Sequence, residues 1–457
     1  MAISVGRTPR PLRTRRQRYN DGKAARQKVP RSSHAQWTAP KGRPDPVDTL
    51  VAESRNRVPS LVPIWFGRMS LSPFTFYRGS ASIMARDLST TPTTGARVQL
   101  CGDAHLSNFG IFATPERDRV FDINDFDETL PGPWEWDVKR LATSLVLVGR
   151  HNGFPREVNR RTTRTALRAY RIAMEAFGAA RYLDTWYVHI DRQTVAKRST
   201  RTGRKVIDAA IRRARMRTVF HAFPKLVHTV HGQYRIRDDP PLIVHYRNPA
   251  DAEESRLFFD RYMATLSDER RTLLERYHIV DVAQKVVGVG SVGTVCSVIL
   301  LMADRDLEDP LFLQLKQANA SALEPYAGPS EYENHAQRVV IGQHLIQEAS
   351  DIFLGWSRLN SRDFYLRQLR DMKFVADVTS LRPKALLGLA ELCGLALSRA
   401  HARTGDPAFI SGYLGTRDLF DQAVTEFAEA YADQAERDHA ALRQAIRRGR
   451  IAAMPDV

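Results

Sequence analysis

Two short acidic stretches, GDAHLSN from Gly102 to Asn108 and DFD from Asp125 to Asp127, decide the fold prediction for this chain. A strand-like run of alternating residues precedes each of them, at 97–101 and at 119–124. Strand ends on a rigid scaffold hold polar groups in fixed positions. The two stretches are therefore predicted to be loops of a single site.

The side chains of these loops suit phosphate chemistry on a magnesium ion. Such chemistry needs a carboxylate that orients or deprotonates a hydroxyl, and oxygen ligands for Mg²⁺ beside the phosphates. We assign Asp103 as the base and Asn108 and Asp125 as the metal ligands. His105 either contacts the substrate or forms a hydrogen bond within its own loop. Asp and Asn are also common in ordinary turns, so neither loop alone would indicate a site. The assignment rests on finding both loops, in this order, after adjacent strands.

A glycine-rich stretch with the spacing Gly288-x-Gly290-Ser291-x-Gly293 lies further along the chain. This spacing fits a turn that opens a helix over a dinucleotide, or a hairpin that covers the phosphates of ATP. Residues 294–301 are mostly β-branched and aliphatic, which is a poor start for a helix. The sequence therefore favours the hairpin.

A lysine, Lys316, ends the next predicted strand. In kinases a lysine on the third strand binds the α- and β-phosphates and pairs with a glutamate on a helix. Lys316 is predicted to act in this way. A helix is expected over 330–349, where Glu333 is the first candidate for the partner and Glu331 and Glu348 are the alternatives.

Three arginines, Arg78, Arg367 and Arg370, are further candidates for binding a phosphate or an acidic substrate. Pairing at the surface or within the protein is the simpler role for each of them.

The spacing Asp-x-His-x-x-Asn that begins at Asp103 resembles the catalytic loop of aminoglycoside and choline kinase-like phosphotransferases. The Asp-Phe pair at 125–126 is similar to their metal-binding motif, although Asp127 stands where glycine is usual. In the same comparison, Asp137 takes the place of an aspartate that supports the loop from the start of a helix.

The order of the parts is reversed relative to a typical kinase, since the acidic loops come first. We infer an α+β, two-lobed, protein-kinase-like fold with a circularly permuted chain. Residues 1–47 would be a basic arm, partly disordered, and 48–279 the half of the helical lobe with the catalytic loop. Residues 280–376 would form the β lobe over the nucleotide, and 377–457 helices that pack back on the helical lobe.

A series of motifs between Gly22 and Asp406 resembles, in order, a bacterial family catalogued as domain of unknown function 2252. That family is grouped with the protein-kinase-like superfamily. The motifs include FYRG from Phe76, GDAHLSNFG from Gly102, FDINDFDET from Phe121, VGVGSVGT from Val287 and AHARTGD from Ala400. The resemblance implies a fold and a nucleotide site, and it brings no known substrate.

The net charge of +17 is concentrated in two segments, 1–47 and 192–217. Such charge attracts phosphate-rich partners, including nucleic acid and anionic membrane surfaces, but a solvated arm and a basic helix explain it as simply. The first segment has two aromatic residues, Tyr19 and Trp37. Any association with nucleic acid is therefore expected to be weak and sensitive to salt.

The sequence contains three widely spaced cysteines, no apolar run of membrane-spanning length and no secretory signal, so we expect a cytoplasmic protein. The predicted function is ATP- and Mg²⁺-dependent transfer of phosphate to a hydroxyl of a small molecule or a protein. The alternatives are AMP transfer on the same frame and non-catalytic binding of nucleotide or nucleic acid. A metal-dependent hydrolase that uses Asp103, His105 and Asp125 would leave the glycine-rich stretch and Lys316 unexplained.

Overall fold

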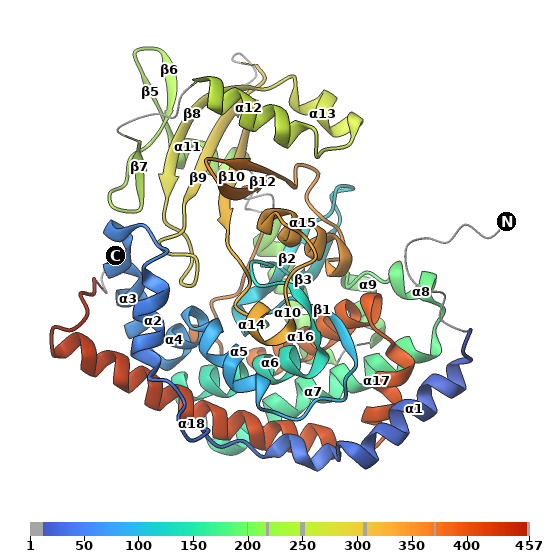
Figure 1. The fold of residues 1–457 in the computed structure, drawn as a ribbon. Coiled ribbons are helices and arrows are strands. Elements are labelled where there is room, and N and C mark those ends of the chain that lie inside the picture. Colours follow the sequence, from blue (N-terminus) through green and yellow to red (C-terminus); the bar gives the residue numbers. More distant parts are fainter. Residues whose placement is uncertain are drawn as a thin grey trace.

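The computed structural model describes residues 12–198, 200–215, 219–246, 252–304, 309–369 and 372–454. These residues form a mixed α+β fold in which one antiparallel sheet stands above a larger body of helices (Figure 1). The α+β class predicted from the sequence is confirmed.

The first described residues form helices rather than an extended arm. These helices are α1 (Arg15–Lys28), α2 (Pro46–Ser54), α3 (Val62–Ser70), α4 (Pro73–Gly79) and α5 (Ala81–Ser89). Thr14 and Gln17 form a capping box that begins α1. Gly22 lets α1 cross close to α17 (Pro407–Leu414), because a Cβ there would lie 1.9 Å from the carbonyl oxygen of Phe409. This segment therefore differs from the expected, partly disordered arm: its described part is helical and docked.

Arginines of the same segment hold it to the body. Arg26 and Arg31 donate hydrogen bonds to backbone carbonyls at the end of α17. Arg43 forms ion pairs with Asp87 and Asp438 that are almost completely buried. Part of the basic charge thus stabilises the docking, and binding of nucleic acid through this segment stays a prediction.

Two short antiparallel hairpins frame the acidic loops. β1 (Arg97–Leu100) pairs with β4 (Leu130–Pro133), and β2 (Phe109–Ala113) pairs with β3 (Arg119–Ile123). The two strands predicted before the loops are therefore confirmed. β2 was not predicted, because its short apolar run becomes a strand through its pairing with β3.

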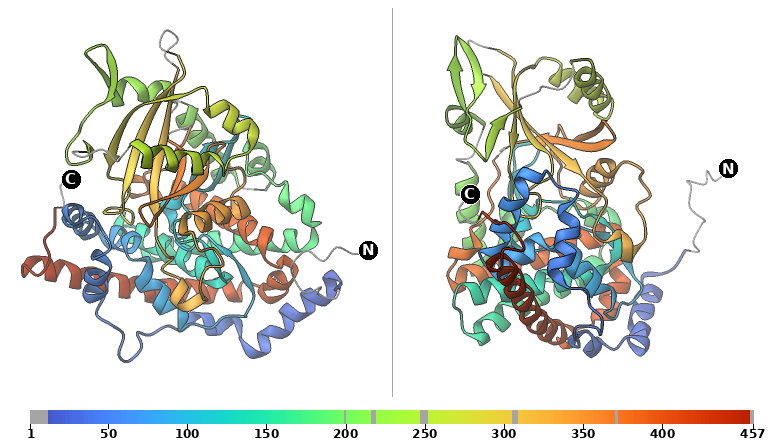
Figure 2. Two further views of the ribbon diagram at one scale, coloured as in Figure 1. Left: turned by 45° about the horizontal axis from the view of Figure 1, so that its top comes forward. Right: turned by 60° about the vertical axis from the view of Figure 1, so that its left-hand side comes forward.

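The helical body joins elements from both ends of the chain (Figure 2). Its main helices are α6 (Trp134–His151), α7 (Arg156–Ala179), α16 (Pro383–Thr404) and α18 (Leu419–Arg447). α16 packs on α7, and α18 packs along α6. Arg399 of α16 and Asp122 of β3 form a fully buried ion pair. The C-terminal helices therefore pack against the half of the chain that carries the acidic loops.

The large sheet has the strand order β11-β12-β10-β9-β8-β7 and is antiparallel throughout. Its strands are β7 (Ile243–His245), β8 (His278–Lys285), β9 (Cys296–Met302), β10 (Pro310–Ala318), β11 (Gly355–Leu359) and β12 (Arg362–Gln368). The predicted boundary at residue 280 lies inside β8, and β7 joins the edge of the sheet from earlier in the chain.

Helices cover both faces of this sheet, namely α11 (Val219–Leu226), α12 (Ala252–Met263), α13 (Asp268–Leu274) and α15 (His335–Ile346). Leu311 and Leu313 of β10 belong to a core cluster with residues of α12 and α13. Phe312 points to the other face and packs near Phe223 of α11. Because side chains alternate along a strand, Lys316 lies on the face of Phe312.

The remaining elements are α8 (Tyr182–Trp186), α9 (Arg192–Arg198), α10 (Arg201–Arg215), β5 (Val227–Val230), β6 (Gln233–Ile236) and α14 (Glu324–Ala327). The second basic segment of the sequence thus contains α9 and α10. Within the described ranges, no helix combines the length and the low polarity that crossing a membrane would require.

Candidate functional site

The first acidic loop is held from the start of α6. Asp137 accepts hydrogen bonds from the backbone N–H groups of Cys101 (2.8 Å) and Gly102 (3.1 Å), and Nε2 of His401 lies 3.3 Å from the same carboxylate. Gly102 has a φ of +82°, and a Cβ on it would lie 2.3 Å from the carbonyl oxygen of Glu128. The supporting role predicted for Asp137 matches this geometry, and glycine is required at the turn.

Asp103 is paired with an arginine that the sequence analysis did not single out. Nε of Arg140 donates to Oδ1 of Asp103 over 2.6 Å, and the Arg140 side chain is 3% exposed. Burial raises the pKa of Asp103, and the attraction of Arg140 opposes that shift. The arginine therefore favours the ionised carboxylate that a base requires.

His105 lies beside the same carboxylate, with Nε2 3.5 Å from Oδ2 of Asp103. Burial, followed by the charges of Arg78 and Arg140, keeps the pKa of His105 well below its usual value. The imidazole is thus neutral near pH 7. This position within the loop is compatible with both roles left open for His105.

A backbone hydrogen bond joins the second acidic loop to the first, and a side-chain bond holds the first loop together. The N–H of Asn124 donates to the carbonyl oxygen of Asn108 (2.8 Å), and Nδ2 of Asn108 donates to the carbonyl oxygen of Asp103 (2.7 Å). Although burial opposes the shift, Lys316 and other nearby cations lower the pKa of Asp125 to about 2. Asp125 is therefore a fully ionised carboxylate, one residue after the Asn124 that bonds to Asn108.

Lys316 contacts the acidic loop rather than a glutamate on a helix. Its Nζ lies 3.4 Å from Oδ1 of Asp125 and forms a closer ion pair with Asp127. The side chain is 3% exposed. The position predicted for the lysine is thus confirmed, and it lies on β10 directly beside the acidic loop.

The predicted partner Glu333 does not pair with Lys316. Asn334 caps α15, so Glu333 lies before the helix, and it is exposed. Glu331 is exposed as well, and Glu348 accepts hydrogen bonds from His189 and the N–H of residue 190. From α15, Arg338 donates to the carbonyl oxygens of residues 127, 129 and 319, and His335 lines the cavity beside the acidic loops.

The glycine-rich stretch connects β8 to β9 as a hairpin loop. A strand follows it, so the hairpin prediction is confirmed and the helix-opening alternative is wrong. Arg57 and Arg68 donate to the carbonyl oxygens of Gly290 (2.8 Å) and Gly288 (2.6 Å). Oγ of Ser291 donates to Asp127 over 3.2 Å. The loop therefore lies directly against the second acidic loop.

A cavity of about 480 Å³ lies between these parts. Predicted site residues that line it are Asp103, His105, Asn108, Asp125, Gly288, Gly290 and Ser291. Gly293, Lys316 and Glu333 are not among the lining residues; Lys316 reaches the cavity through its contacts with the two aspartates of the second loop.

Two charged residues that were not assigned a main role from the sequence also lie in the cavity wall. Arg78, at the end of α4, lines the cavity, and its Nε is buried without a hydrogen-bond partner in the described part of the chain. Glu128 lines it as well, and burial raises the pKa of its carboxyl group to about 7. Arg367 lies outside this cavity, and Arg370 lies outside the described residues.

The sequence patterns did not point to two side chains of the candidate site, Arg140 and Asp127. Arg140 follows Asp137 by three positions on a helix, a spacing that places both on one face and could have identified it. Asp127 was considered only as a departure from glycine, whereas its carboxylate binds Lys316, Ser291 and the hydroxyl of Tyr365.

The oxygen atoms available at the acidic loops suit a magnesium ion that keeps some of its water and phosphate ligands, rather than a metal enclosed by protein ligands alone. Across the ranges that the structure describes, no three His, Cys, Asp or Glu side chains converge as metal ligands. Mg²⁺ usually takes one or two carboxylates and completes its shell with water and substrate phosphates. Asp125 and the amide oxygen of Asn108 could supply such a partial set.

No curated protein and no solved structure gives a significant match to the chain. One family model does match it, over residues 57–445, a range that includes the acidic loops, the glycine-rich loop and Lys316. The chain therefore belongs to the bacterial family described as "Uncharacterized protein conserved in bacteria (DUF2252)".

Proposed function

We propose that this chain is an ATP- and Mg²⁺-dependent phosphotransferase with a circularly permuted, protein-kinase-like fold. The observation that carries the proposal is the contact of Lys316 and Ser291 with Asp127. This contact joins a strand lysine and a glycine-rich hairpin loop to the second acidic loop, from a distant part of the chain. Phosphoryl transfer uses these same parts.

The arrangement of the upper sheet supports the permuted fold. Lys316 lies on the third strand of the series β8, β9 and β10, and the glycine-rich loop joins the first two. α15 packs beside β10 and β12. The C-terminal helix α16 meets the loop of Asp103 through the contact between His401 and Asp137. The glycine-rich loop and the lysine strand thus lie beside the acidic loops as in kinases, although Lys316 pairs with Asp125 and Asp127 instead of a helix glutamate and the chain order differs.

The phosphates would be held by Lys316 and by backbone N–H groups of Gly290 and Ser291. A phosphate oxygen would compete with Asp127 for Lys316 and for the hydroxyl of Ser291. Binding therefore requires the contacts of Asp127 to rearrange. Asp125 and Asn108 would hold Mg²⁺, which neutralises charge on the phosphates when it is bound.

Asp103 would orient the acceptor hydroxyl and accept its proton. Arg140 favours the ionised form of this carboxylate against the effect of burial, and it fixes the carboxylate's position through the hydrogen bond from Nε. Arg78 lines the same cavity and would stabilise negative charge that develops on the transferred group. A neutral His105 beside Asp103 adds no competing positive charge.

The test is transfer of label from ATP in the presence of Mg²⁺, measured with γ-labelled and with α-labelled nucleotide. Water and the chain itself are the first acceptors to examine. We expect γ-label to be transferred by the wild type and lost in Asp103→Ala and Asp125→Ala. Asp184→Ala is the matched control, since Asp184 is exposed on α8. Transfer of α-label would instead identify AMP transfer, and unchanged γ-transfer in both site variants would contradict the mechanism.

A further inference from the structure

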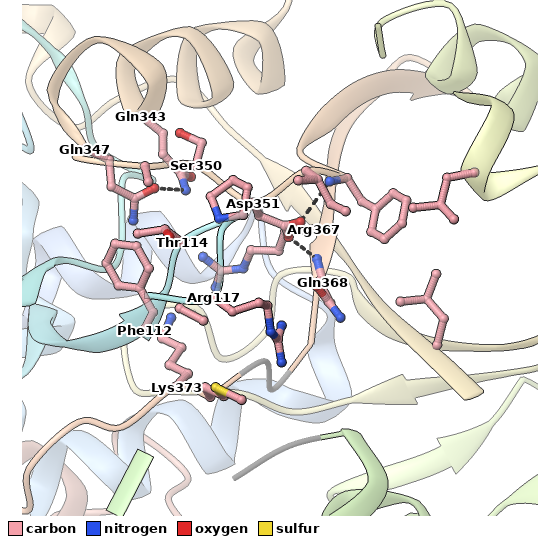
Figure 3. Close-up of a pocket in the computed structure, with 18 of the residues that line it drawn as sticks. Phe112, Thr114, Arg117, Gln343, Gln347, Ser350, Asp351, Arg367, Gln368 and Lys373 are labelled. Atoms are coloured by element: carbon pink, nitrogen blue, oxygen red, sulfur yellow. Dashed lines mark hydrogen bonds between the residues drawn. The ribbon is translucent and has the colours of Figure 1, made fainter. Parts of the chain in front are cut away.

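A second cavity, of about 560 Å³, shares no lining residue with the first. Its wall comes from the turn after β2, the end of α15 with the residues that follow, and the end of β12 (Figure 3). The labelled side chains in that view are Phe112, Thr114, Arg117, Gln343, Gln347, Ser350, Asp351, Arg367, Gln368 and Lys373. Its volume lies in the range of small-molecule sites.

Two cations in this wall are held by neutral oxygens. Nη1 of Arg367 and Nζ of Lys373 both donate to the carbonyl oxygen of Asn124, over 3.3 Å and 3.5 Å. Nε of Arg367 donates to Oε1 of Gln314 (3.0 Å). Within the described ranges, neither cation forms an ion pair with a carboxylate. Burial, followed by the charge of Arg367, lowers the pKa of Lys373 to about 7.

The carboxylates in the same wall are engaged by other groups. Asp351 accepts hydrogen bonds from the backbone N–H groups of Phe353 (2.8 Å) and Gln368. Asp309 accepts one from the hydroxyl of Tyr277 (3.3 Å). Arg367 and Lys373 thus lie in the wall without a carboxylate at ion-pair distance among the described residues, although the charges of Asp125 and Asp351 act on Lys373 from further away.

The wall also contains one buried donor and one buried acceptor without a partner in the described part of the chain. These are Nδ2 of Asn124 and Oε1 of Gln343, and the two side chains are 5% and 4% exposed. Buried polar atoms in native proteins nearly always have a partner, which a protein group, water or a ligand supplies.

The rest of the lining is largely apolar and includes Phe112, Leu273, Leu311, Ile352, Phe353 and Met372. We propose that this cavity is a binding site for a small molecule. Its head group is an oxyanion, either a phosphate or a carboxylate, and its body is an apolar ring system. The head binds Arg367 and Lys373. The guanidinium of Arg367 forms charge-assisted hydrogen bonds to the oxyanion, and the nearby negative charge favours the protonated form of Lys373. The body packs against the apolar lining.

This cavity shares no lining residue with the proposed phosphotransferase site. Because Arg367 and Lys373 also lower the pKa of Asp125, the tests use ligands and variants that distinguish the two sites. Isothermal titration calorimetry with 1-naphthyl phosphate and with 1-naphthoate measures binding of the two possible heads. Inorganic phosphate lacks the body, and 1-naphthol lacks the head. We expect at least one aromatic anion to bind, with both fragments at least about tenfold weaker.

Two variants in the cavity and one control variant locate the bound molecule. Lys373→Met removes one charge at nearly constant size, and Ser350→Trp fills the cavity without changing any charge. Each is expected to weaken binding of the aromatic anion by about tenfold or more. Lys384→Met is the control, because Lys384 is an exposed lysine at the start of α16, and it should leave the affinity unchanged.

Lys316→Met separates this inference from the proposed function. Binding of the aromatic anion should survive Lys316→Met, whereas nucleotide binding should not. Absence of binding by both aromatic anions would overturn the inference. Wild-type affinity in both Lys373→Met and Ser350→Trp, or loss of affinity in Lys316→Met alone, would also overturn it. The circular dichroism spectrum of each variant shows whether it is folded. Lys373→Met removes a charge and Ser350→Trp removes space, so the two variants test the cavity independently.

Discussion

The Nε atom of Arg140 lies 2.6 Å from Oδ1 of Asp103, and both side chains are at least four-fifths buried. An ion pair in such a place does not by itself stabilise a fold, because both charges lose their hydration. It does hold a carboxylate in one position and oppose the rise in its pKa that burial causes. The pair thus links the start of α6 to the chemistry proposed for Asp103.

Arg140→Met should therefore destabilise the protein strongly, since it leaves Asp103 buried and without its partner. We expect a loss of roughly 3–5 kcal/mol in the free energy of unfolding, measured by urea denaturation. The double variant Arg140→Met/Asp103→Asn removes the uncompensated charge and should recover much of that loss. A loss below about 1 kcal/mol in the single variant would contradict this account of the pair.

Gly102→Ala should destabilise the protein by more than about 2 kcal/mol, because it adds both backbone strain and a close contact with the carbonyl of Glu128. Gly95→Ala is the matched control. Gly95 has a similar φ of +81°, but no atom lies within 4 Å of the position of an added Cβ. Thermal unfolding of the two variants separates strain from contact, and equal losses would show that the contact has no effect.

Gly22→Ala tests the docking of α1 on α17. Within an isolated helix this change stabilises by up to about 1 kcal/mol. Here the added Cβ would meet the carbonyl oxygen of Phe409 at 1.9 Å, so the sign should reverse. The measurement is the urea midpoint of the full chain, and a stabilised variant would show that the two helices do not cross this closely.

His34 should make the protein sensitive to acid. Its Nε2 lies 2.7 Å from the hydroxyl of Tyr413, and burial, followed by the charge of Lys139, lowers the pKa of His34 to about 3. As the pH falls below 6.5 the unfolded chain binds a proton that the folded chain does not bind, so stability is lost between pH 6.5 and about pH 3.

Within this window His34 alone contributes a loss of about 1.4 kcal/mol per pH unit. The free energy of unfolding of His34→Gln should consequently fall less steeply with decreasing pH. His151→Gln, at an exposed position, should keep the wild-type slope. Identical slopes for all three proteins would show that His34 accepts a proton in the folded state.

Local patterns predicted much of the site because its motifs are short. Asp103, Asn108 and Asp125 were assigned from spacing within loops, and the structure brings the two loops together through the bond between residues 124 and 108. Residues after the glycine-rich stretch were read as a strand for their β-branching, and β9 is that strand. Signals of this kind act over a few residues, so the sequence shows them directly.

The predictions that failed concern where helices begin and which residues far apart in the sequence contact each other. Asn334 caps α15 through a hydrogen bond from the N–H of Gln337, and this cap places Glu333 outside the helix. The capping box of Thr14 and Gln17 was also present in the sequence and would have predicted α1. The contact of Lys316 with Asp127 and the walls of the second cavity depend on segments that only the folded chain brings together.

Binding of ATP with Mg²⁺ is the central claim, and thermal unfolding of the full chain measures it most directly. A ligand at a hundredfold excess over its Kd adds about 2.7 kcal/mol to the stability of the folded state. We predict that ATP stabilises the wild type more in the presence of Mg²⁺ than in its absence. Asp125→Ala should lose the Mg²⁺ dependence, and Lys316→Met should lose the stabilisation itself. Equal unfolding temperatures of the wild type with and without Mg²⁺ and ATP would contradict the account.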